Sequence, residues 1–180
     1  MRTATIVIAA YLLGVVLAVA WFHLPFAVVR DAVPDLGALT AAYLGLTARR
    51  TVAPAVGGSV VLGYLIDLIS GAPAGVMALV LGLTGLVART VQQRILVRGA
   101  TMTIAFSAFV AIVSGVLALL VRVIYHVPRS SLGIELQHIG VVTVATALLG
   151  PLVWRMCRRI DAAFARTHRE REAALEGLAP

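Results

Sequence analysis

The amino-acid sequence predicts an all-α integral membrane protein with six transmembrane helices. Of its 180 residues, 61% are hydrophobic and only 13% are charged, whereas a soluble domain has about 25% charged residues. The charged residues also separate long uncharged stretches. A helix rises about 1.5 Å per residue, so about 20 residues cross a hydrocarbon layer about 30 Å thick. The predicted spans are 4–25, 35–49, 52–70, 73–92, 99–125 and 137–156, within a membrane domain of residues 1–160.

The first span is expected to be a retained helix rather than a cleaved secretory signal. Arg2 precedes the apolar run, as it would in a signal peptide. However, the run continues through Trp21 and Phe26 without a small-residue cleavage site, and five more apolar segments follow.

The second span is short, and Pro34 and Asp35 begin it. Proline presets φ for the first turn, and a carboxylate there faces the positive end of the helix dipole. Because a helix of this length cannot easily cross a bilayer, we expect neighbouring helices to surround it.

The third and fourth spans are predicted to form an antiparallel hairpin, because only residues 70–74 join them. Gly71 can end the third helix in a left-handed conformation, and Pro73 can start the fourth. Gly63, Gly75 and Gly82 are among the small residues that would let the two backbones approach closely in lipid.

Two further helices carry small residues at intervals of four. The stripes are Ser107, Ala111 and Gly115 on the fifth helix, and Ala10, Gly14 and Ala18 on the first. We expect both stripes to pack inside this protein. Gly150 and Pro151 should kink the sixth helix, and residues 161–180 are predicted to form a cytoplasmic helical tail.

The distribution of arginine predicts the orientation of the bundle. The arginine-rich side holds Arg2, Arg49, Arg50, Arg89, Arg94, Arg98, Arg155, Arg158 and Arg159, and the opposite side holds Arg30, Arg122 and Arg129. By the positive-inside rule, the arginine-rich side and both termini are expected to be cytoplasmic. Trp21 on the outer side and Trp154 on the inner side are expected to be interfacial aromatics. The arginines form no basic face with interleaved aromatics, so nucleic acid is not an expected partner.

The polar residues within the spans are too few to suggest catalysis. Asp67 is the one acidic residue inside a predicted span, and His23, His126 and His138 lie near the outer interface. No nucleophile motif, metal-ligand spacing or phosphate-binding loop is present, and Cys157 is the single cysteine. We therefore predict no enzymatic activity, no metal and no cofactor.

Asp67 has two interpretations. In the structural one, its carboxylate bonds to backbone amides of the following turn or to the hydroxyl of Ser70. In the functional one, it binds a partner helix or a ligand. We favour the structural interpretation, since an acid at a helix end escapes much of the cost of burial in the membrane centre.

Residues 63–75, which read GYLIDLISGAPAG, resemble the signature hairpin of the rod shape-determining protein MreD family. Pro34 and Asp35 before a short second helix also resemble that family. The resemblance implies an inner-membrane subunit of the bacterial elongation machinery that binds MreC directly. It also implies a shared complex with MreB, RodA and a class B transpeptidase, and a fold similar to the substrate-binding subunit of energy-coupling-factor transporters.

The predicted function is that of a non-enzymatic scaffold that helps couple MreB filaments to peptidoglycan synthesis. The hairpin residues Gly63, Asp67, Gly71, Pro73, Gly75 and Gly82 would bind the partner or shape the hairpin. The cytoplasmic arginines would face MreB or anionic lipid. The alternative is a vitamin-binding transporter subunit, whose expected Ala-x-x-x-Ala stripe is approximated by Ala10, Gly14 and Ala18.

Overall fold

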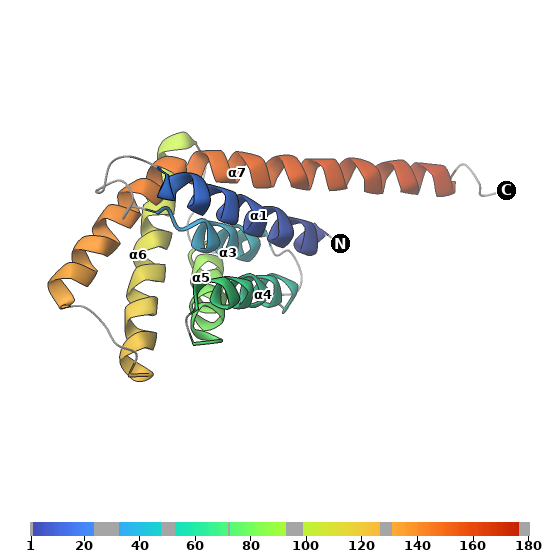
Figure 1. Cartoon of the computed structure of the whole chain (residues 1–180). Helices are drawn as coiled ribbons and strands as arrows, with labels where there is room; N and C mark the ends of the chain where they lie inside the picture. The colour runs from blue at the N-terminus through green and yellow to red at the C-terminus, as the bar shows by residue number, and fades with distance from the viewer. Residues whose placement is uncertain are drawn as a thin grey trace.

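In the computed structural model, the described residues are 2–23, 33–47, 53–71, 73–92, 99–126 and 131–176, without the side chains of Arg2, Phe22, Gln92 and residues 166–176. Within these ranges the chain forms six α-helices and no strand, which confirms the all-α prediction (Figure 1). The helices are α1 (Arg2–Phe22), α3 (Leu36–Thr47), α4 (Ala53–Ser70), α5 (Val76–Gln92), α6 (Ala100–Ile124) and α7 (Leu132–Glu176).

Four helices are long and apolar enough to cross a membrane, and two are shorter. The long apolar segments are Thr3–Trp21, Ala53–Ser70, Ala100–Ile124 and Leu132–Ala165. The shorter ones are Leu36–Thr47, as expected, and Val76–Val91, which was predicted to begin at Pro73. Pro73 lies three residues before the first residue of α5, because Gly75 has φ +102 and cannot belong to a helix.

Helix α3 lies at the centre of the bundle. Every residue from Leu36 to Leu46 is buried, and α1, α4, α5, α6 and α7 all contact this helix. Its twelve residues extend only about 18 Å. Because other helices surround it, its ends have protein neighbours rather than hydrocarbon, as backbone groups in a membrane require.

Helices α6 and α7 pack through the small residues predicted for the fifth span. Ser107 and Ala111 are buried, and Gly115 faces the side chain of Ile139 on α7. Gly150 of α7 leaves room for Ser107, whose hydroxyl would collide with an added Cβ. The prediction that this stripe packs inside the protein is confirmed.

Helix α7 is one continuous helix of 45 residues that changes direction along its length (Figure 1). Pro151 lies inside it and removes one backbone donor. The segment after the bend runs beside α1 and extends past the other helices (Figure 1). Residues 161–176 therefore continue the sixth predicted span without a break.

Trp154, which the sequence predicts as an interfacial aromatic, is buried inside the bundle. It is 8% exposed, and its ring centroid lies 5.7 Å from that of Tyr43 and 5.7 Å from that of Phe106, both edge-on. The reason is the orientation of this part of α7, which turns Trp154 toward α3 and α6. Close by, the Tyr43 hydroxyl donates to Asp161 Oδ2 at 2.5 Å.

Candidate functional site

Asp67 is buried where α4 meets the start of α5. Its Oδ2 accepts hydrogen bonds from the backbone amides of Gly75 at 2.9 Å and Ala78 at 3.3 Å. Its Oδ1 accepts from the amide of Met77 at 3.0 Å. The first amides of a helix have no partner within the helix, and the helix dipole favours negative charge there. The carboxylate therefore caps α5 from another helix.

The structural interpretation expected Asp67 to bond to backbone amides of the turn or to the Ser70 hydroxyl, and the structure shows the bonds to amides. The Ser70 hydroxyl does not reach the carboxylate, and instead donates to the backbone carbonyl of Asp67 at 3.4 Å. Asp67 is only 2% exposed, so its carboxylate faces the inside of the hairpin. Its role in binding a partner stays a prediction.

The turn of the hairpin depends on two glycines with positive φ. Gly71 has φ +65 just after α4, and Gly75 has φ +102 just before α5. A Cβ added at either position would meet nothing within 4 Å. Both residues are therefore needed for backbone conformation rather than for close packing. The exposed Pro73 lies in the turn between them.

Gly63 and Gly82 serve the packing of α4 against α5. An added Cβ at Gly63 would collide with the backbone of Met77 and Ala78. At Gly82 it would lie 2.9 Å from Cγ2 of Val60. Sequence reasoning missed Gly45, whose Cβ position is filled by the Gly85 carbonyl. The space beside Gly63 and Gly82 is thus filled from within the chain.

Asp35 forms a second buried polar cluster, which joins three helices. Its Oδ1 accepts from the amide of Ala38 at 2.8 Å, which confirms its predicted position at the start of α3. Its Oδ2 accepts from the Ser114 hydroxyl of α6 at 2.8 Å, and its own amide donates to Thr146 Oγ1 of α7 at 2.9 Å. The contacts with α6 and α7 were not predicted. The sign available in the sequence was that the hydroxyls of Ser114 and Thr146 lie within apolar spans, because buried polar groups need hydrogen-bond partners.

The small-residue stripe on α1 is only partly packed inside the protein. Ala10 is 5% exposed, but an added Cβ at Gly14 would meet nothing within 4 Å, and Ala18 is exposed. These three residues and Tyr11 line a cavity of about 340 Å³ between α1, α4 and the start of α3. The expectation for this stripe was wrong beyond Ala10, because none of the described helices covers the rest.

The predicted cytoplasmic arginines fall into two groups. Arg49, Arg50, Arg94 and Arg98 lie outside the described residues. Arg155, Arg158 and Arg159 are exposed on α7, and Arg89 is half-buried near the end of α5. The three histidines near the predicted outer interface are exposed. In the described part of the chain, no three His, Cys, Asp or Glu side chains lie together as a metal site would require.

Comparison with known protein families matches residues 1–160 to the family described as rod shape-determining protein MreD. No curated protein matches the chain. No solved structure matches it either, so the expected likeness to transporter substrate-binding subunits stays a prediction.

Proposed function

Because that match covers most of its length, the chain belongs to the MreD family of rod shape-determining membrane proteins, and on this premise we propose that it is a non-enzymatic scaffold of the rod complex. In this role it binds MreC in the inner membrane and helps couple MreB filaments to peptidoglycan synthesis by RodA and a class B transpeptidase.

The observation that supports a scaffold is the use made of the buried polar side chains. The carboxylate of Asp67 is bonded to the start of α5, and that of Asp35 is bonded to α3 and α6. Catalysis by such groups would need atoms that can reach a substrate. Here the same atoms hold helices together, which favours a rigid binding surface over an active site.

The surface for MreC must be one that the chain does not cover itself. The space beside Gly63 and Gly82 of the hairpin is filled from within, whereas α1 exposes more than half of Ile8, Leu12 and Val16. Crosslinking from a single cysteine at Leu12 on α1, compared with one at Leu68 on α4, would locate the MreC helix. Both positions are about 60% exposed, so a difference would reflect the partner rather than access to the reagent.

The main test is copurification in a rod-shaped host. We expect MreC to copurify with the tagged protein from mild detergent, and cells to become round when the protein is depleted. Normal rods after depletion would contradict the proposal. Expression of the Asp67→Asn variant at the wild-type protein level should restore rods, since the scaffold needs no reactive carboxylate.

The orientation with both termini in the cytoplasm is part of the same proposal. It is supported by the excess of arginine on one side of the predicted spans. Reporter fusions at each terminus test it: a cytoplasm-active reporter should work at both ends, and a periplasm-active one at neither.

A further inference from the structure

A groove of about 320 Å³ lies between α1 and α7. Its apolar lining includes Leu13 and Leu17 of α1 and Leu152 of α7. Leu152 is 64% exposed, so the groove is open to the surroundings of the bundle. An apolar surface of this kind suits hydrocarbon.

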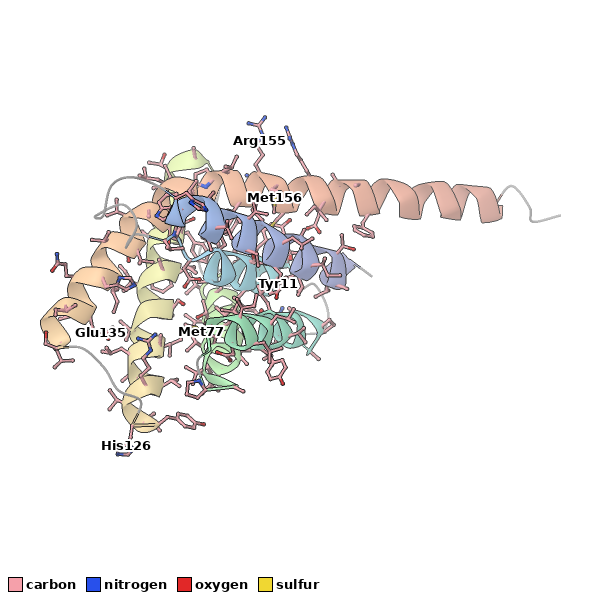
Figure 2. The ribbon with its side chains drawn as sticks, in the orientation of Figure 1. Tyr11, Met77, His126, Glu135, Arg155 and Met156 are labelled. Atoms are coloured by element: carbon pink, nitrogen blue, oxygen red, sulfur yellow. The ribbon has the colours of Figure 1, made fainter. Side chains whose placement is uncertain are left out.

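Two arginines line one end of the groove. Arg155 and Arg159 are exposed and, among the described residues, make no hydrogen bond or ion pair. Figure 2 shows Arg155 projecting outward from α7. The two residues are one helical turn apart, so their side chains are neighbours. Arginine can lay its apolar stem along a hydrophobic surface while its guanidinium reaches polar surroundings.

The lining of the groove along α7 changes from apolar residues to arginines. Its lining residues on this helix begin at Leu149 and end at Arg159, which is about 15 Å at 1.5 Å per residue. The part before the first arginine, from Leu149 to Val153, is about 6 Å long, so on this helix the groove can hold part of an acyl chain. Leu149, Leu152 and Val153 come first, and Arg155 and Arg159 follow with Met156 between them. This order suits an acyl chain and its headgroup.

We propose that this groove binds an anionic phospholipid, with an acyl chain along the leucines and the phosphate between Arg155 and Arg159. Charge complementarity selects this occupant. The 340 Å³ cavity on the other side of α1 has no cation among its lining residues, and its one charged residue, Asp35, is already hydrogen-bonded. The proposal is independent of MreC binding.

Arg158 provides a matched control on the same turn of α7. It has the same charge and is also exposed, but it does not line the groove, and its Nε donates to the Trp154 carbonyl at 3.4 Å. Diffuse attraction to an anionic surface would affect all three arginines alike. If the lipid binds in the groove, substitution of Arg158 should weaken lipid binding less than substitution of Arg155 or Arg159.

The experiment measures binding of phosphatidylglycerol, with phosphatidylcholine as the neutral comparison, to the full-length protein in nonionic detergent by native mass spectrometry. We expect Arg155→Gln and Arg159→Gln each to weaken phosphatidylglycerol binding about fivefold, the effect of one arginine near an anionic lipid surface. Arg158→Gln should change it less than twofold. Equal losses in all three variants, or no loss in the first two, would overturn the proposal.

A second variant tests the acyl chain without touching any charge. Leu152→Trp enlarges an exposed side chain that lines the groove, so the protein should keep its unfolding temperature while phosphatidylglycerol binding falls severalfold. Unchanged binding by this folded variant would show that the chain lies elsewhere and would refute the groove as its site.

Discussion

The α4–α5 hairpin and helix α1 both carry small residues at helical spacing, but the structure uses them differently. In the hairpin, Gly63 lies against the backbone of the neighbouring helix. On α1, Gly14 has open space where its Cβ would be. A small residue permits a close approach in lipid, and only the tertiary structure decides whether the same chain supplies the neighbour.

The hairpin and α1 also differ in the charged residues that they contain. The hairpin contains Asp67, which bonds one helix to the start of the next. Helix α1 has no charged residue between Thr3 and Trp21. The hairpin is therefore a closed structural unit, whereas α1 is held by apolar contacts along one side.

The largest expected effect is that of Asp67→Ala, which would remove the anchor of the hairpin. Three buried or half-buried amides would lose their acceptor, and each such loss costs about 1–3 kcal/mol. We expect the free energy of unfolding to fall by about 3 kcal/mol or more in a dodecyl sulfate titration. Ser70→Ala, on the same turn and exposed, is the control and should change it by less than about 0.5 kcal/mol.

Gly63→Ala tests the closeness of the two backbones. The new Cβ would meet the main chain of Met77 and Ala78, which cannot rotate away, so we expect a loss of about 1–3 kcal/mol from overpacking. Gly57→Ala, on the same helix with nothing within 4 Å, serves as the comparison. Equal stability of the two variants would contradict the closed hairpin.

Gly82→Ala should have a smaller effect within the same hairpin. Its Cβ would meet only a methyl group of Val60, which is 39% exposed and can change rotamer. We expect the loss of stability to stay below about 1 kcal/mol, the typical cost of an unfavourable rotamer. The same titration measures it, and a loss as large as that of Gly63→Ala would show that Val60 is fixed in place.

The smallest effect on stability is expected for Gly14→Ala on α1. The position is open and helical, so the change should be neutral or stabilise the helix by up to about 1 kcal/mol. Thermal unfolding of the purified protein would show it. Clear destabilisation would mean that α1 packs as tightly as the hairpin.

The features that follow from local chemistry were predictable from the sequence. Asp67 had to find a partner inside the membrane, and the nearest donors were the amides of the turn that follows it. Gly71 could be assigned to a left-handed turn because few other residues adopt that conformation. Likewise, a short second helix needed protein neighbours, and α3 has them on all sides.

The features that depend on distant parts of the chain were not predictable. Asp35 bonds to residues 79 and 111 positions away, and no local pattern connects them. Trp154 has the position of an interfacial aromatic in the sequence, but the rotation of α7 buries it. The open face of α1 has the same spacing as the packed face of α6, so spacing alone could not separate them.

Because α7 stays helical through its bend, the segment after the bend can act mechanically as a lever arm on the bundle. From Pro151 to Glu176 the helix is about 38 Å long, and the Tyr43–Asp161 bond lies about 15 Å from the same pivot. A sideways load on Glu176 that this bond alone resisted would be opposed at Asp161 by a force about 2.5 times greater, the ratio of the two arms. A rotation of ten degrees at Pro151 would move Glu176 by about 7 Å. A load on this end of α7 therefore reaches the central helix α3 through the Tyr43–Asp161 bond, as well as the helices α1 and α6 that pack against α7.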